Sequence, residues 1–242
     1  MAAIRLDQFM VREGLARTRS QAREAILRGA VRLNGETARR ASQPVPEGAA
    51  VEAEADPLAS RAGHKLAAAL DHFAIDVTGR RALDVGASTG GFTDVLLRRG
   101  AEAVAAVDVG RAQLAPHIAA DPRVAVLDGM NARHLVAGDL PFAPDLAVMD
   151  LSFISLTLVL PAVLPLALPG ARLVALIKPQ FEVGRAAIGK GGIVRDEAAV
   201  EAAIARVSAA VAHGGFEVDG VIGSPIAGGD GNREYLLGAH RI

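Results

Sequence analysis

The chain has 242 residues, of which 51% are hydrophobic and 22% charged, so it can bury a core and is neither a disordered tail nor a linker. At about 150 residues per domain, this length predicts one full-sized domain and a smaller module. The absence of cysteine excludes a disulfide framework, a cysteine nucleophile and a cysteine-based metal site. The first residues lack the apolar stretch of a signal peptide, so we expect a cytoplasmic protein.

Charge is divided unevenly along the chain, although the formal net charge is only −1. Residues 5–40 contain nine arginines and four acidic residues, a net charge of +5, which leaves −6 for the rest. Such an asymmetry is typical of a module that contacts a polyanion, and nucleic acid is the first candidate. Seven Phe, one Tyr and no Trp are too few for an RNA-recognition sheet that stacks bases, so we expect arginine contacts to dominate.

The basic module, which we place at residues 1–58 with its linker, has the pattern of two short helices and several strands. Apolar spacing predicts a first helix that ends near Gly14 and a second that runs from about residue 18 to Gly29. The elements predicted next are a strand at residues 31–33, a tight hairpin turn at Asn34-Gly35, and a last short strand with the linker in residues 43–58. We expect a cationic RNA-binding face here, with a merely solvated surface as the alternative. Its residues are Arg5, Arg12, Arg19, Arg23 and Arg28.

The larger domain, residues 59–242, has strands that alternate with helices. The predicted strands are residues 82–85, 103–107, 124–127, 146–149, 172–177, 216–222 and 235–239. The predicted helices are about residues 91–98, 156–166 and 197–212. This alternation predicts an α/β fold with a doubly wound, mostly parallel sheet, which binds ligands at the carboxyl ends of its strands.

One stretch of this domain, residues 151–171, has no charged residue and is long enough to span a membrane. Pro161, Pro165 and Pro169 interrupt it at four-residue spacing, which favours a short buried helix over a spanning one. A membrane-active protein is therefore an alternative for which this stretch is the candidate segment.

A Gly-rich loop after the first strand of the larger domain predicts a nucleoside cofactor site. Glycines let the backbone approach a ligand, and the N–H groups at the start of a helix favour a carboxylate or another anion. Aspartates at the ends of the following strands can accept hydrogen bonds from ribose hydroxyls or an adenine amino group. The candidate cofactor-binding residues are Asp84, Gly86, Ala87, Ser88, Gly90, Gly91, Phe92, Asp108 and Asp128. The alternative is that the glycines serve only the turn.

The same loop also indicates which cofactor to expect. Ser88 occupies the position at which a dinucleotide fingerprint needs glycine, which disfavours NAD. The loop instead resembles the S-adenosylmethionine site of Rossmann-like methyltransferases, in which it holds the amino acid end. A second loop, from Gly184 to Lys190, begins like a P-loop but continues with Gly191 in place of the magnesium-binding Ser or Thr, which disfavours ATP hydrolysis.

The lysines are the candidates for proton chemistry. Of 26 cationic side chains only Lys65, Lys178 and Lys190 are lysines, and lysine, unlike arginine, can lose its proton near neutral pH. Asp150 and Lys178 follow neighbouring predicted strands, so we expect them at the same edge of the sheet. Lys65 lies near the start of the larger domain, and Glu234 leads into its last strand.

Such a set suits the methylation of a weakly acidic hydroxyl such as the ribose 2′-hydroxyl. A lysine has an unperturbed pKa of about 10.4, so a lysine base requires burial or a second cation to lower that pKa. The expected roles are general base for Lys178, tuning and orienting cation for Lys65, positioning of Lys178 and the methyl donor for Asp150, and holding of an amine or ribose for Glu234. Ordinary surface salt bridges are the alternative for each.

Several motifs together carry a resemblance to a known family. They are the pattern from Arg5 to Gly35, Asp84-Val-Gly-Ala-Ser-Thr-Gly-Gly-Phe-Thr-Asp94, Asp150-Leu-Ser-Phe-Ile-Ser-Leu156, Lys178-Pro-Gln-Phe-Glu182, Gly191-Gly-Ile-Val-Arg-Asp196 and Ser224-Pro-Ile-Ala-Gly-Gly-Asp-Gly-Asn-Arg-Glu-Tyr235. With these motifs the chain resembles the TlyA-type (hemolysin A) family of ribosomal RNA methyltransferases, in which an S4 RNA-binding module precedes an FtsJ-like domain with a Rossmann-like class I methyltransferase fold.

The resemblance implies a Lys-Asp-Lys-Glu tetrad at Lys65, Asp150, Lys178 and Glu234. It also implies S-adenosylmethionine as cofactor, no metal, and 2′-O-methylation of cytidines in 16S or 23S ribosomal RNA, as free RNA or in ribosomal subunits. Ala62 departs from the pattern, which has a glycine there.

Some assignments stay open at this point. Phe153 and Phe181 either stack on the target base or pack in the core. Lys190 is a further candidate for RNA binding. A membrane-active hemolysin and an RNA-binding assembly factor without catalysis are the alternative functions.

Overall fold

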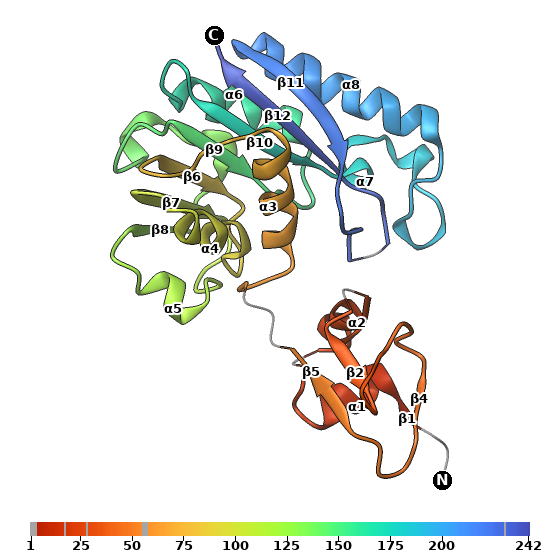
Figure 1. Cartoon of the computed structure of the whole chain (residues 1–242). Coiled ribbons are helices and arrows are strands. Elements are labelled where there is room, and N and C mark those ends of the chain that lie inside the picture. Colours follow the sequence, from red (N-terminus) through yellow and green to blue (C-terminus); the bar gives the residue numbers. More distant parts are fainter. Residues whose placement is uncertain (1–3, 17, 28, 55–57, 230) are drawn as a thin grey trace. The chain divides into compact units, whose positions relative to one another are not determined.

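The computed structural model describes residues 4–16, 18–27, 29–54, 58–229 and 231–242. The chain divides into two compact units, Met1–Pro57 and Leu58–Ile242, called here the N-terminal and C-terminal units (Figure 1). Each unit has its own hydrophobic core.

The N-terminal unit packs two short helices against small antiparallel sheets. Its elements are β1 (Ile4–Arg5), α1 (Leu6–Arg12), α2 (Arg19–Leu27), β2 (Val31–Leu33), β3 (Glu36–Thr37), β4 (Pro44–Val45) and β5 (Val51–Ala53). β1 pairs with β4, and the other sheet has the order β3-β2-β5. Apolar residues at helical spacing, Leu6 and Met10 on α1 and Ala22 and Ile26 on α2, are fully buried in its core.

The predicted elements of this unit are confirmed, and the structure adds β1, β3 and β4. The turn between β2 and β3 shows why the prediction succeeds. Asn34 and Gly35 have φ of 51° and 81°, the left-handed conformation that a two-residue hairpin turn requires and that these two residue types adopt most readily.

The C-terminal unit is built on a seven-stranded sheet with the order β11-β12-β10-β9-β6-β7-β8. Its strands are β6 (Arg81–Val85), β7 (Ala103–Asp108), β8 (Val124–Asp128), β9 (Leu146–Met149), β10 (Arg172–Ile177), β11 (Phe216–Gly223) and β12 (Tyr235–Arg241). The five strands from β6 to β10 pair in parallel, and β12 is antiparallel to both neighbours. The chain leaves β6 toward β7 on one side and returns to β9 on the other, so a switch point lies between β6 and β9, where such sheets bind ligands.

Helices cover both faces of this sheet, as Figure 1 shows. They are α3 (Ala62–His72), α4 (Gly91–Arg98), α5 (Pro116–Ala119), α6 (Leu160–Val163), α7 (Pro179–Glu182) and α8 (Glu197–His213). Alternate residues of β10 enter different cores: Val174 and Leu176 pack with α3 and α4, whereas Leu173, Ala175 and Ile177 pack with α6 and α8. Covering both faces explains the continuous apolar runs from which the interior strands were predicted.

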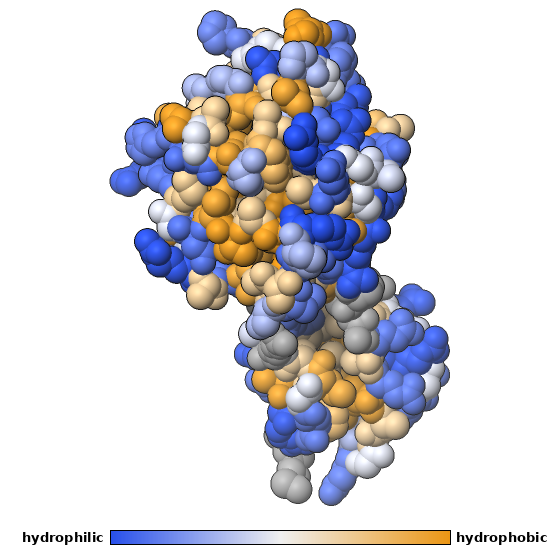
Figure 2. Space-filling model, turned by 90° about the vertical axis from the view of Figure 1, so that its left-hand side faces the viewer, coloured by the Kyte–Doolittle hydropathy of each residue, from blue (hydrophilic) through white to orange (hydrophobic). Residues whose placement is uncertain are grey.

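One edge of the sheet is less well covered. β8 is an edge strand whose residues are half-buried or exposed, and the side chain of Val126 is 38% exposed. Figure 2 shows apolar side chains gathered on this side of the C-terminal unit.

Two predictions for this unit need correction. The helix predicted at residues 156–166 is broken into a 3-10 turn at Leu156–Leu158, the short helix α6 and a second 3-10 turn at Leu164–Leu166. Pro161 and Pro165 cause the breaks because a proline has no N–H to donate and its ring blocks the preceding turn. The prediction also omitted α3, although Leu66, Ala69, Leu70 and Phe73 have helical spacing.

In the part of the chain that the structure describes, no helix has the length and apolar character that crossing a membrane requires. The uncharged stretch at residues 151–171 contributes core residues instead, including Leu160, Val163 and Leu164.

Candidate active site

The loop after β6 meets the loop after β9 at the switch point of the sheet. Gly86 has φ of 88°, and a Cβ atom at this position would lie 2.4 Å from the carbonyl oxygen of Asp150. The backbone N–H of Asp150 in turn donates to the carbonyl of Val85. Glycine is therefore needed at position 86 both for its conformation and for the close approach of the two loops.

Carboxylates hold the loops at this edge in place. Asp108 accepts hydrogen bonds from the backbone N–H groups of Ser88, at 2.8 Å, and Gly110, at 2.7 Å. Asp128 accepts one from the N–H of Ala112 at 2.7 Å. A carboxylate has about four lone-pair sites, so both aspartates retain acceptor capacity for a ligand.

A cavity of about 370 Å³ opens beside these loops. Of the predicted cofactor residues, Gly86, Ser88 and Asp108 line it. Asp150, Ser152 and Phe153 form another part of its wall. Val109, Gln113, Met130 and Leu151 also line it, and they were not predicted although each follows the end of a strand closely.

The remaining predicted loop residues lie behind or beside the cavity. Ala87 is buried, and Phe92 packs in the core with α3. Gly90 and Gly91 pack against Ile118 and Ser60, where a Cβ atom would lie 2.6 and 2.1 Å from side-chain atoms. The side chain of Phe92 and the α-carbons of these glycines thus serve packing, while cofactor binding through the backbone at this helix start stays a prediction.

Asp84 lies beneath the loop and is fully buried. One carboxylate oxygen accepts a hydrogen bond from the Thr93 hydroxyl at 2.6 Å, and the other has no hydrogen-bond partner. Burial, reinforced by the negative charges of Asp150 and Asp108, raises the pKa of Asp84 to about 7, although the Thr93 hydrogen bond opposes the shift. Asp84 is therefore partly protonated near pH 7, and Asp108 and Asp150 are the carboxylates that make this region favourable for a cationic ligand.

Asp150 and Lys178 follow β9 and β10, which pair in parallel, and their side chains form an ion pair. The Lys178 Nζ lies 2.6 Å from Asp150 Oδ1, without hydrogen-bond geometry, and donates a hydrogen bond of 2.8 Å to the Ser152 hydroxyl. The two charged side chains are 11% and 15% exposed, so the pair is largely withdrawn from water but still accessible.

Lys65 and Glu234 form a second ion pair, which is buried. Lys65 comes from α3, and Glu234 directly precedes β12. Because Ile177 of β10 pairs with Tyr235 of β12 in antiparallel register, Lys178 and Glu234 occupy the next positions of the two adjacent strands. Both ion pairs therefore lie at the same end of the strands, where Asp150 lines the cavity.

Glu182, at the end of α7, links the loops that carry Asp150 and Lys178. Its carboxylate accepts hydrogen bonds from the Ser155 hydroxyl, at 2.6 Å, and from the Leu156 N–H, at 2.7 Å. The sequence analysis quoted Glu182 as part of a motif but gave it no role. Its partners lie 26 and 27 residues away, so spacing alone carries no signal for this contact.

Phe153 and Phe181 lie side by side, with ring centroids 5.2 Å apart. The Phe153 side chain is 92% exposed, which removes the core alternative for this residue. Its φ of 65° is unusual for a non-glycine residue and holds the ring out into solvent at the mouth of the cavity.

The arginines predicted to form a cationic face in the N-terminal unit surround a buried carboxylate. Arg5, Arg19 and Arg23 each donate to Asp7, at 3.0 to 3.2 Å, while their own side chains stay 40% to 52% exposed. The side chain of Asp7 is fully buried, and these hydrogen bonds hold its pKa well below its usual range. The three guanidinium groups and the Asp7 carboxylate, called here the Asp7 cluster, thus have a net charge of +2 at a fixed position.

The other residues proposed to bind RNA behave differently. Arg12 pairs with Glu13 and lies over the Phe9 ring. Lys190 is exposed in a 3-10 turn at Lys190–Gly192 of the C-terminal unit. Arg28 lies outside the described residues. Among the described residues, the structure has no group of three or more His, Asp or Glu side chains that could hold a metal ion.

Comparisons with known proteins agree with this architecture. The family model of the FtsJ-like methyltransferases matches residues 58–241, and that of the S4 domain matches residues 4–51. The chain is 47% identical over 236 residues to the 16S/23S rRNA (cytidine-2′-O)-methyltransferase TlyA of Mycobacterium tuberculosis, covering 96% of this chain and 88% of that protein.

Solved structures show the same relationship. A structure described as a candidate hemolysin from Streptococcus thermophilus is 40% identical, covers 99% of this chain and 88% of its own, and has a TM-score of 0.77. Magnesium protoporphyrin IX methyltransferase of Synechocystis, solved with bound S-adenosylmethionine, shares only the fold, with 15% identity, coverage of 75% and 81%, and a TM-score of 0.51. The chain therefore belongs to the TlyA-type family, in which an S4 domain precedes an FtsJ-like methyltransferase domain.

Proposed function

We propose that this chain transfers a methyl group from S-adenosylmethionine to the ribose 2′-hydroxyl of a cytidine in ribosomal RNA. The observation that carries the proposal is the placement of two lysine–carboxylate pairs at one sheet edge beside a cavity at the switch point. Membership of the TlyA-type family favours this function over a membrane-active protein. The cytoplasm, where ribosomes are found, is the compartment that this function requires.

S-adenosylmethionine fits the cavity electrostatically. The carboxylates of Asp108 and Asp150, which line the cavity, favour its cationic sulfonium and amino groups. Gly86 leaves space at the approach of the two loops, and Asp108 is placed to accept from ribose hydroxyls. When bound, this cofactor supplies an electrophilic methyl group at its sulfonium.

The lysine–carboxylate pairs would handle the proton that the reaction releases. Lys178, once its ammonium has released a proton to solvent, would take the proton from the ribose 2′-hydroxyl while the oxygen acquires the methyl group. Asp150 and Ser152 hold that amine toward the cavity.

Lys65 and Glu234 would position the reacting groups. Their buried pair places a second positive charge at the same edge without exposing it to water. Phe153, exposed at the mouth of the cavity, offers a surface on which the target base can stack. Holding oxygen, methyl group and sulfur in line can lower the activation free energy by up to about 7–11 kcal/mol, which is more than general-base catalysis by the lysine contributes.

The N-terminal unit would bind RNA through the Asp7 cluster, because arginine guanidinium groups pair well with phosphate oxygens. The two compact units then correspond to two functional domains, one for RNA binding and one for catalysis.

The test is to incubate the full chain with methyl-labelled S-adenosylmethionine and ribosomal subunits that lack the modification. We expect label on a ribose 2′-oxygen of a cytidine, located by nuclease mapping. Label on a base, or none on any subunit or free ribosomal RNA, would contradict the proposal.

A further inference from the structure

A second pocket, of about 240 Å³, lies at the same end of the strands as the lysine–carboxylate pairs. Its lining includes Pro179 and Tyr235, which directly follow Lys178 and Glu234 in the chain. The cofactor cavity lies at the ends of β6, β7 and β9, whereas this pocket lies at the end of β10 and the start of β12. Asp150 thus lines the cofactor cavity, while Lys178 and Glu234 directly precede two residues that line the second pocket.

Parts of two motifs that the proposed reaction does not use line this pocket. They are residues 193–195 of the first motif and Gly231, Arg233 and Tyr235 of the second. Asn232, whose side chain is buried, joins them: it donates to the Gly192 carbonyl and accepts from the Val194 N–H, each at 2.9 Å. Because Glu234 lies two residues after Asn232, these two hydrogen bonds hold the pocket in a fixed position relative to the proposed catalytic groups.

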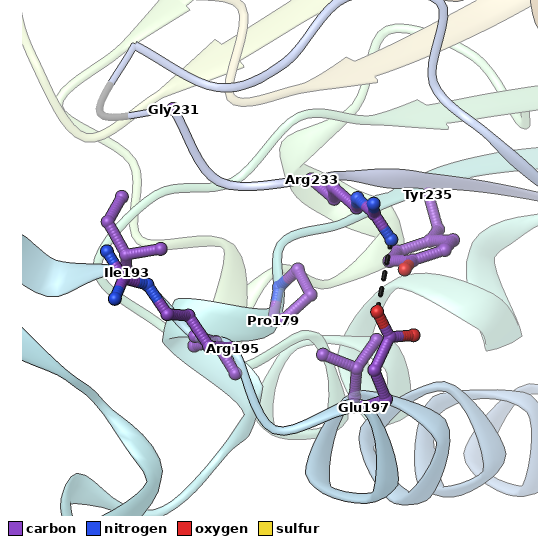
Figure 3. A pocket seen from close by; sticks show the side chains of 9 residues that line it. Pro179, Ile193, Arg195, Glu197, Gly231, Arg233 and Tyr235 are labelled. Carbon is purple, nitrogen blue, oxygen red and sulfur yellow. Dashed lines mark hydrogen bonds and ion pairs between the residues drawn. The ribbon is translucent and has the colours of Figure 1, made fainter.

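The pocket offers polar groups that the protein itself does not fully use. Arg195 is exposed and makes no hydrogen bond or ion pair with any residue that the structure describes. Arg233 pairs with Glu197 at 3.2 Å, but the two side chains are 78% and 75% exposed, and exposed ion pairs contribute little stability. The ring of Tyr235, the single tyrosine of the chain, forms part of the same wall (Figure 3).

We infer that this pocket binds the nucleotide next to the methylated one, with its phosphate between Arg195 and Arg233 and its base against Tyr235. The inference rests on the proposed function, because only an RNA substrate places a nucleotide there. Arginine suits phosphate through paired N–H donors, and an aromatic ring accepts any base by stacking. The pocket fixes the register of the RNA at the sheet edge, which brings a single ribose to Lys178.

The path of the RNA follows from what surrounds Lys178. The cofactor occupies the side toward β9, so an RNA strand whose ribose lies at Lys178 can continue along the edge toward β12. Glu197 holds Arg233 in the unbound chain, and a phosphate oxygen replaces this carboxylate on binding. Neutralising Glu197 should therefore strengthen binding.

Initial rates of methyl transfer test the inference, with the full chain, S-adenosylmethionine and ribosomal subunits that lack the modification. We expect Arg195→Ala and Tyr235→Leu each to raise KM for the subunits about tenfold and to change kcat by less than about twofold, since a stacked base or a phosphate contact acts mainly on binding. Tyr235→Phe keeps the stacking ring, so it should raise KM far less than Tyr235→Leu does, and Glu197→Gln should lower KM.

Arg99→Ala is the matched control. It also removes one positive charge, and it breaks an exposed ion pair with Asp71. Arg99 caps the C-terminal end of α4, at the opposite end of the strands from the second pocket. Arg195→Ala should also reduce the salt slope of RNA binding by about one, and Arg99→Ala should leave it unchanged. If Arg195→Ala and Tyr235→Leu match Arg99→Ala while the unchanged chain is active, the inference is wrong and the proposed function stands. An inactive unchanged chain would instead contradict the proposed function.

Discussion

Asp7 in the N-terminal unit and Asp84 in the C-terminal unit are both fully buried, yet their pKa values are shifted in opposite directions. Three arginines donate hydrogen bonds to Asp7 and hold its pKa well below the usual range. Asp84 has one hydroxyl donor and two other acids nearby, and burial raises its pKa to about 7. Neighbouring charges therefore decide the outcome of burial for these two residues.

The difference also separates what the two units can do. The Asp7 cluster is a fixed positive surface, because arginine keeps its proton at any physiological pH, and this suits a polyanion. The C-terminal unit instead pairs each of two carboxylates with a lysine, whose proton can be removed, at the edge of a cavity that favours a cation. Binding and chemistry are thus assigned to different cations.

The largest expected effect is an opposite dependence of stability on pH in the two units. The folded C-terminal unit binds the Asp84 proton between about pH 4 and pH 7, so its free energy of unfolding falls as pH rises through this window, by about 4 kcal/mol for a shift of this size. The contribution of Asp7 has the other sign: it is present above about pH 4 and is lost as pH falls below that value.

Hydrogen exchange of core amides, measured separately for each unit from about pH 2 to pH 7, checks this prediction. The variant Asp84→Asn keeps an acceptor for Thr93 and should abolish the dependence in the C-terminal unit. An unaltered pH dependence in that variant would rule out Asp84 as its source.

Breaking the buried Lys65–Glu234 ion pair should lower the free energy of unfolding by less than the pH effect of Asp84 does. Glu234→Gln leaves the Lys65 ammonium buried without a counter-charge, and we expect the free energy of unfolding of the C-terminal unit to fall by about 3 kcal/mol. Urea titration provides the measurement. Asp71→Asn, which breaks the exposed pair with Arg99, is the control and should cost less than about 1 kcal/mol. Equal losses in the two variants would mean that burial of the Lys65 pair has no energetic consequence.

The smallest expected effect concerns the Asp7 cluster. Asp7→Asn adds one positive charge, so charge alone predicts tighter RNA binding, but it also releases three arginines from fixed positions. We expect affinity for ribosomal RNA to fall about tenfold, equivalent to about 1.4 kcal/mol. Glu13→Gln is the matched control, because it neutralises an exposed acid that pairs with Arg12 alone. Fluorescence anisotropy at fixed salt measures the RNA affinity of each variant. Tighter binding by Asp7→Asn than by the unchanged chain would contradict the role of the cluster.

The sequence predicted the sheet well because its interior strands are continuous apolar runs that end in charged or turn residues. Residues 146–149 and 172–177 were predicted with the bounds that the structure shows. The helix at residues 156–166 was predicted too long because apolar character persists through Pro161 and Pro165, whereas backbone hydrogen bonding does not.

The candidate site was predictable where a residue follows a strand directly, as Asp150 and Lys178 do. Contacts across long sequence separations were not. Asp7 meets Arg19 and Arg23 from 12 and 16 residues away, and Asn232 meets Val194 from 38 residues away. No local pattern carries these pairings, since they depend on how the elements pack.

The most direct test of the account exchanges the cation at position 178. Lys178→Arg keeps the positive charge beside Asp150 but cannot act as a base, so single-turnover methyl transfer should fall by at least about 100-fold while S-adenosylmethionine affinity, measured by calorimetry, stays the same. The reciprocal exchange Arg19→Lys, in the Asp7 cluster, should leave the single-turnover rate unchanged. A Lys178→Arg variant that transfers the methyl group at nearly the original rate would contradict the assignment of Lys178 as the base.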